Sequence, residues 1–164
     1  MKNLIIIIAF QIMLSGCVSV EQRKKNIESD IAELYSAHLS AEIQEFFVEE
    51  SVNAGVKAIR AMKPSDVLPP TNEYEMVGCA YGFKNSKLIL IEVSRPNCIT
   101  PSVLAHEISH IGANCSAHND HFYKYNWKIA ERYQNRFPDA TKRKWFAPVQ
   151  SVGNISAIYR SEGC

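Results

Sequence analysis

The spacing of apolar residues divides the N-terminal half of the chain into distinct patterns. Residues 4–14 form an apolar run in which Gln11 is the one polar residue, whereas residues 18–26 are mostly polar and show no apolar period. From Ile27 to Ile59 the apolar positions recur at roughly helical spacing, which predicts one long helix or two. If there are two helices, we expect the break near Gly55, because glycine weakens a helix interior.

Extended structure is predicted in the middle of the chain. Residues 64–72 contain three prolines and predict a connecting loop. Two β-prone runs follow, at residues 74–83 and 87–94, and the turn sequence Lys84-Asn85-Ser86 between them predicts a β-hairpin. The stretch from Leu88 to Ile91 is continuously apolar, which indicates a strand covered on both faces.

Boundary signals frame a short helix after the hairpin. Thr100 is a suitable N-cap, Pro101 suits the first helical position, and Gly112 can take the left-handed conformation that ends a helix. One face of this helix is apolar and is expected to enter the core, through Leu104, Ile108 and Ile111.

A second helix is predicted to follow. Asn119 or Asp120 can cap its beginning, and Pro138 stops it. Its large apolar and aromatic residues are expected in the core: Tyr125, Trp127, Ile129, Tyr133 and Phe137.

Residues 1–16 are predicted to be an export signal rather than part of the domain. They begin with a basic residue, and their apolar run is too short to span a bilayer as a helix. The segment Leu14-Ser15-Gly16-Cys17 resembles a bacterial lipobox, which implies cleavage before Cys17 and lipidation of that cysteine. An ordinary secretory signal with an incidental cysteine is the alternative. The polar residues 17–26 then form a lipidated tether, and residues 27–164 form one domain.

The lipobox resemblance also implies a location. A lipidated Cys17 would hold the chain on a membrane at the extracytoplasmic side of a bacterial envelope. Val18 after the cysteine resembles lipoproteins that are sent to an outer membrane. Without the signal and its Lys2, 17 basic residues balance 17 acidic residues. A neutral, exported chain is not expected to bind nucleic acid, which needs a surplus of Lys and Arg.

Four further cysteines predict two disulfides in an oxidising compartment. Three connectivities are open, and we favour Cys79 with Cys98 and Cys115 with Cys164. The alternative, metal ligation by these thiols, is disfavoured because the chain has no CxxC pair.

The segment His106-Glu107-Ile108-Ser109-His110 carries the strongest chemical signal. Histidines four apart on a helix lie one turn above each other, so both imidazoles can reach one metal ion. The intervening Glu107 then points beside the metal toward a bound water. This spacing is typical of zinc hydrolases.

A zinc hydrolase needs a third protein ligand, for which the following sequence offers His118, His121 and Glu131. A helix ended by glycine reverses the chain, so a histidine at the start of the next helix can return to the metal. The run from His118 to Phe122-Tyr123 resembles the second half of the signature in SprT-like and WLM-type metallopeptidases, where a third histidine precedes an aromatic pair. This resemblance covers residues 106–123 and implies His118 as the third ligand.

The order of predicted elements indicates an α+β fold, and the resemblance implies a small zincin-like domain. It implies Zn²⁺ as cofactor, Glu107 as general base and a peptide or protein as substrate. In such folds the last strand before the active helix often offers its free edge to an extended substrate, so residues 87–94 are expected to have one. The alternative function is a lipid-anchored binding or structural protein of the envelope with a non-catalytic zinc site.

Overall fold

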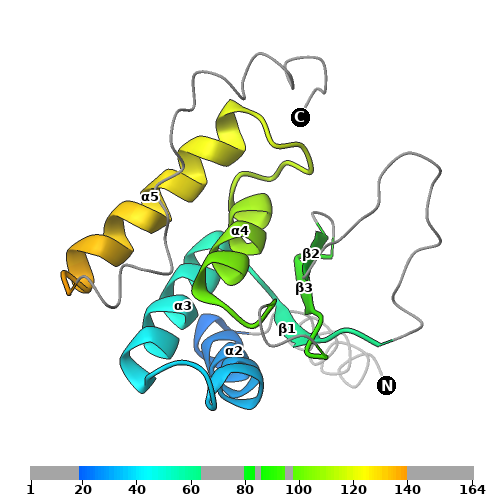
Figure 1. Cartoon of the computed structure of the whole chain (residues 1–164). Coiled ribbons are helices and arrows are strands. Elements are labelled where there is room, and N and C mark those ends of the chain that lie inside the picture. The colour runs from blue at the N-terminus through cyan, green and yellow to red at the C-terminus, as the bar shows by residue number, and fades with distance from the viewer. Residues whose placement is uncertain (1–18, 64–79, 84–85, 95–97, 140–164) are drawn as a thin grey trace, which may run out of the picture.

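The computed structural model describes residues 19–63, 80–83, 86–94 and 98–139. The predicted export signal and Cys17 lie outside these residues. The elements are, in chain order, α2 (Val20–Tyr35), α3 (Ala41–Ala54), β1 (Ala58–Ala61), β2 (Ala80–Phe83), β3 (Leu88–Ile91), α4 (Pro101–Gly112) and α5 (Asp120–Arg136). Helices and a small sheet together make an α+β fold, as predicted (Figure 1).

Helix α2 begins within the segment that was predicted to be a tether. Ser19 has an extended backbone and its side chain accepts a hydrogen bond from the Gln22 N–H at 3.0 Å, so the helix starts at Val20. The prediction that the tether extends to residue 26 is therefore wrong from Val20 on, where the chain is helical. An N-cap of this kind can start a helix ahead of the first buried residue, which here is Ile27.

The region predicted as one helix or two contains two helices and a strand. Helix α3 ends at Gly55, whose φ of 83° is left-handed and whose N–H bonds to the carbonyls of Ser51 and Val52. Beyond it the helical prediction is wrong, because Ala58–Ala61 forms strand β1. Val56 and Ile59 are buried, so apolar residues that continued the helical spacing are used by a strand instead.

The sheet has the order β1-β3-β2, with β1 parallel and β2 antiparallel to the central strand β3. The antiparallel pair β2–β3 confirms the predicted hairpin, and burial of Ile89, Leu90 and Ile91 confirms a covered strand. The prediction of a free edge at residues 87–94 is wrong, because β3 is paired on both sides. Within the described sheet, β1 and β2 are the edge strands.

Side chains of the helices form most of the hydrophobic core. Helix α2 packs on α3 and β1, and α4 lies between β2 and α5 (Figure 1). Phe46 and Phe47 of α3 meet Tyr133 of α5 with ring centroids 5.3 and 6.0 Å apart. Trp127 was expected in the core, but half of it is exposed because it faces away from these contacts.

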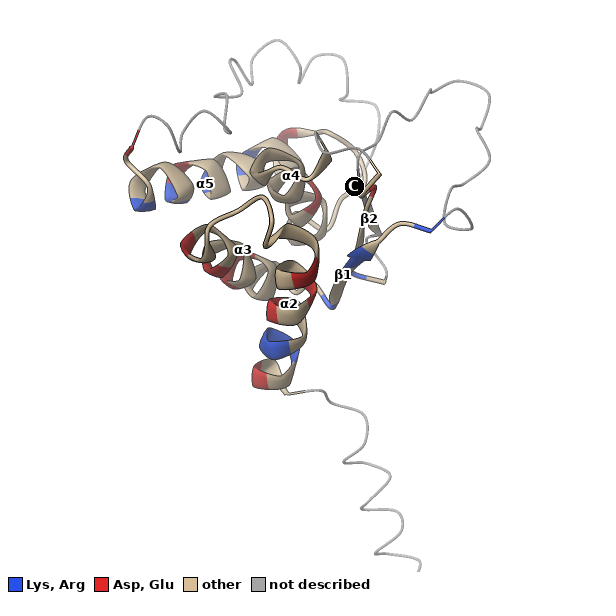
Figure 2. Cartoon of the chain, turned by 60° about the horizontal axis from the view of Figure 1, so that its bottom comes forward, with Lys and Arg blue, Asp and Glu red and all other residues tan. Residues whose placement is uncertain are grey.

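Charged pairs join the same two helices. Figure 2 shows acidic residues on α3 next to basic residues on α5. Arg132 donates two hydrogen bonds to the buried carboxylate of Glu50, at 2.7 and 2.6 Å. Arg136 pairs with the more exposed Glu45 and Glu49 at 3.1 and 2.7 Å. Because Glu50 is buried, its pair fixes the relative position of α3 and α5 more firmly than the surface pairs do.

Helix α4 has the predicted start but a different end. Thr100 accepts a hydrogen bond from the Val103 N–H, and Pro101 opens the helix. Gly112 is still helical, so the prediction that it takes the left-handed conformation is wrong; Asn114, with a φ of 54°, does so instead. Gly112 is required for close packing, since a Cβ there would run into the ring of Tyr125 on α5.

Two of the four predicted disulfide cysteines are described, and both Cys98 and Cys115 are disulfide-bonded. The favoured partners, Cys79 and Cys164, lie outside the described residues. Among the described helices, none combines the length and apolar character needed to cross a bilayer.

Candidate metal centre

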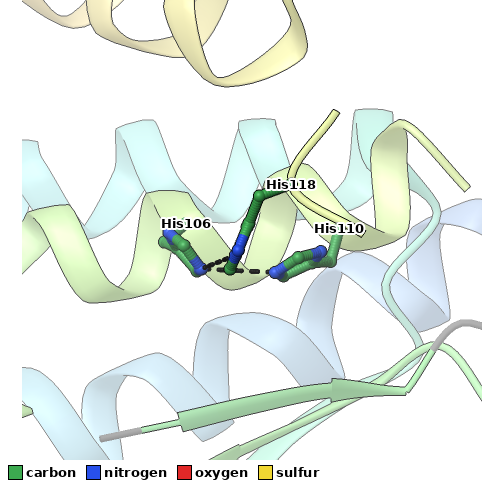
Figure 3. Close-up of side chains that lie close together, drawn as sticks. All are labelled: His106, His110 and His118. Carbon is green, nitrogen blue, oxygen red and sulfur yellow. Dashed lines mark hydrogen bonds between the residues drawn. The ribbon is translucent and has the colours of Figure 1, made fainter. Parts of the chain in front are cut away.

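Three histidines, one buried and two half-buried, converge beside α4. His106 and His110 lie one turn apart on that helix, and His118 comes from the segment just before α5 (Figure 3). The Nε2 atom of His106 is 3.2 Å from Nε2 of His110 and 3.0 Å from Nε2 of His118. One ligand nitrogen from each residue lies within 4.8 Å of the others, so the three side chains can hold a metal ion.

His110 is oriented by the backbone that follows the helix. Its Nδ1 lies 3.0 Å from the carbonyl oxygen of Cys115, so Nδ1–H donates to that carbonyl and Nε2 keeps a free lone pair. Burial, partly opposed by this hydrogen bond and assisted by the nearby His118, lowers the pKa of His110 to about 4. The ring is therefore neutral at physiological pH, as a metal ligand must be.

The pKa of His106 is also lowered, and one aromatic ring packs against all three histidines. Desolvation, followed by repulsion from His110 and His118, lowers the pKa of His106 as well. The ring of Phe122, on the first turn of α5, lies 4.8, 4.4 and 4.8 Å from the rings of His106, His110 and His118. Phe122 is buried and limits the rotation of all three ligand rings. In the sequence, only its place in an aromatic pair pointed to it.

Glu107 lies between the histidines and strand β2. Its Oε1 is 4.0 Å from Nε2 of His106, and 6% of the residue is exposed. Burial raises the pKa of Glu107 to about 8, although a hydrogen bond from the Gly82 N–H partly offsets this effect. A carboxyl group with a pKa near neutrality can both accept and return a proton.

Gly82 was not singled out in the sequence, yet it contacts this carboxylate directly. A Cβ at Gly82 would lie 3.0 Å from Oε2 of Glu107 and 3.2 Å from the Cβ of His110. Strand β2 therefore approaches α4 so closely that a side chain at this position would force its neighbours to shift by a few tenths of an ångström. A glycine within a predicted strand was the available signal for such an approach.

Tyr35 is a second residue that the sequence did not indicate. It is fully buried at the end of α2, and its hydroxyl has no hydrogen-bond partner among the residues that the structure describes. Burial, and then the charge of Glu107, raise the pKa of Tyr35, so its hydroxyl stays protonated beneath the site.

The alternative ligands do not join the cluster in the described part of the chain. His121 is exposed, and its backbone N–H is capped by Asn119. Glu131 is also exposed, more than two turns further along α5. Of the three candidates, the structure brings His118 alone to His106 and His110.

Comparison with protein-family models, with curated proteins and with solved structures finds no match to this chain.

Proposed function

We propose that the chain is a zinc-dependent metallopeptidase with a zincin-like fold, in which His106, His110 and His118 bind Zn²⁺. The supporting observation is the convergence of three imidazole nitrogens: Nε2 of His106 lies 3.2 and 3.0 Å from the other two, and all three lie within 4.8 Å of one another. Tetrahedral Zn²⁺ with Zn–N bonds of about 2.0–2.1 Å requires ligand nitrogens roughly 3.3 Å apart, close to these values. Catalytic zinc sites usually have three protein ligands and one open position, and three histidines are one of the known ligand sets.

Glu107 is the proposed general base. Bound Zn²⁺ would supply a water of lowered pKa and would polarise the peptide carbonyl. Glu107 accepts the proton of the attacking water and passes it to the leaving amine. Its place supports this role, because Oε1 is 4.0 Å from a ligand nitrogen of His106 while the Gly82 amide holds the carboxylate from the other side.

The proposed enzyme works at a membrane surface. The lipobox-like segment ending in Cys17 supports lipidation and therefore a substrate in the bacterial envelope, whereas the SprT-like resemblance of residues 106–123 supports only the chemistry, hydrolysis of a peptide bond.

Metal analysis combined with a peptide-library cleavage assay tests this function on the full chain purified in detergent. We expect one zinc per chain, and Glu107→Gln should retain that zinc while turnover falls by about 100-fold or more. Glu131→Gln is the matched control, because this glutamate is exposed on α5, and it should change neither quantity.

Two results would count against the enzyme. Undiminished hydrolysis by Glu107→Gln would refute the mechanism. Zinc bound by the wild type without any cleavage would favour the alternative, a lipid-anchored binding or structural protein with a non-catalytic zinc site.

A further inference from the structure

The backbone of Cys115 makes two hydrogen bonds with the proposed ligand His110, one as a donor and one as an acceptor. Its backbone N–H donates to the carbonyl of His110 at 3.1 Å, and its own carbonyl accepts from Nδ1 of His110 at 3.0 Å. The first bond fixes where the chain leaves α4, and the second fixes the rotation of the ligand ring. The position of the Cys115 backbone therefore determines how His110 presents Nε2.

The sulfur of Cys115 reaches the other ligand segment. It accepts a hydrogen bond from Nδ2 of Asn119 at 3.2 Å, and Asn119 directly follows the ligand His118. The side-chain oxygen of Asn119 in turn accepts from the N–H groups of His121 and Phe122. Cys115 thus connects the end of α4, the third ligand and the start of α5.

We propose that the disulfide of Cys115 positions His110 and His118 for metal binding, and that its reduction weakens the affinity of the site for metal. This inference rests on the metal centre proposed above. A buried sulfur in a disulfide is anchored to a second point of the chain, whereas a thiol is free to move with its loop. Reduction of the disulfide removes this second attachment. Both hydrogen bonds between the Cys115 backbone and His110, and the hydrogen bond from Asn119 to the sulfur, are then held less firmly.

The reductant in an envelope would be a protein dithiol. Its thiolate attacks the disulfide, its second thiol resolves the mixed disulfide, and it leaves as a disulfide of its own. Two electrons and two protons are thereby transferred, and two thiols remain on this chain. Metal binding would follow the redox state of the compartment.

The test measures zinc and Co²⁺ affinity of the full chain by competition with a chelator, before and after reduction with a water-soluble phosphine, which does not compete strongly for zinc. Because Cys115 is fully buried, complete reduction is verified by alkylation and mass measurement. We expect reduction to weaken binding by about 10- to 100-fold, the usual effect of losing a group that orients a ligand. The Co²⁺ absorption spectrum shows whether a freed thiol has become a ligand.

Cys115→Ala separates positioning from general stability. It should bind metal as weakly as the reduced wild type, its Co²⁺ spectrum should be altered well below the unfolding temperature, and the phosphine should cause no further loss. A variant with a lowered unfolding temperature but unchanged affinity and spectrum would overturn the proposal. So would a Cys115→Ala variant that still loses affinity on reduction, because another disulfide would then be responsible.

Asn119→Asp provides a second, milder variant. Aspartate keeps an oxygen that caps α5 but cannot donate to the sulfur of Cys115. We expect a several-fold loss of affinity with unchanged helix content, and an unchanged affinity would contradict the role of this bond. Failure of the oxidised wild type to bind zinc at all is a different result, since it would refute the metal centre itself.

Discussion

The carboxylate of Glu107 is held between two neighbours that lie far apart in the sequence. One oxygen faces His106 on its own helix, and the group accepts a hydrogen bond from Gly82 of strand β2. The helical spacing predicted His106, Glu107 and His110, because residues four apart share a face whatever the rest of the fold. It could not predict Gly82, because that contact depends on how closely β2 approaches α4.

Gly82→Ala tests this contact. The added Cβ would lie 3.0 Å from Oε2 and 3.2 Å from the backbone oxygen of Glu107, and the carboxylate is the group that can move. We expect the variant to bind zinc while turnover falls several-fold, because the Glu107 carboxylate must give by a few tenths of an ångström and the alignment of a catalytic group affects the rate. Metal analysis and a cleavage assay measure both quantities.

A matched control is Gly55→Ala, which also places a side chain on a glycine but does so away from the centre. Gly55 has a φ of 83°, so alanine there should cost about 1 kcal/mol of stability. Turnover of the folded fraction should stay at the wild-type value. If both variants lose turnover equally, Gly82 has no specific role.

At the scale of elements, local signals predicted helix starts better than strands. Thr100 and Asn119 cap the helices where expected, because a cap needs a few neighbouring atoms only. Strand β1 was missed, since Val56 and Ile59 continue the helical spacing and only pairing with the distant β3 makes the segment extended. The end of α4 was wrongly assigned to Gly112 for a similar reason, because contact with Tyr125 of α5 requires that glycine.

Strand β1 is joined to α2 by a carboxylate, which gives a prediction about pH. Asp30 accepts a hydrogen bond from the Ile59 N–H at 2.8 Å. Desolvation raises the pKa of Asp30 above its ordinary value of 3.8, the Ile59 amide partly opposes this, and Glu33 raises the pKa further. The group therefore stabilises the fold most fully below pH 3.8, and this stabilisation is lost as pH rises through the folded-state pKa.

Asp30→Asn retains an acceptor for the Ile59 N–H but cannot ionise. We expect its free energy of unfolding to exceed that of the wild type at about pH 7, and the difference to shrink toward about pH 4. Asp30→Ala leaves the N–H without this acceptor and should cost about 1–3 kcal/mol. Urea titrations at the two pH values measure these differences, and a constant difference between wild type and Asp30→Asn would contradict the raised pKa.

In the whole molecule, the centre lies where α4 meets both the sheet and α5. Helix α4 supplies His106, Glu107 and His110, β2 supports the carboxylate, and the start of α5 supports the rings. The α+β class and the order of the later elements followed from the sequence. The sheet order did not, because it is decided by long-range pairing of β1 with β3.

The proposed lipidation of Cys17 predicts how the whole molecule fractionates. The chain should sediment with membranes and be released by detergent but not by salt, since salt would screen only the charges of residues such as Lys24 and Lys25. Cys17→Ser should abolish acylation and membrane attachment while zinc binding stays unaltered. A Cys17→Ser protein that still required detergent for release would refute the lipoprotein assignment.

The Ser19 cap of α2 limits how far a lipid-anchored enzyme of this kind could reach. Two residue steps separate Cys17 from Ser19, which is at most about 7 Å of extended chain. Beyond Ser19 comes a helix about 24 Å long that packs on α3 and β1. The catalytic domain of such an enzyme could not move far from its lipid anchor, because the linker before α2 is short. The distance between the metal centre and the membrane surface would be nearly constant, so a scissile bond would have to lie within a narrow layer above the bilayer.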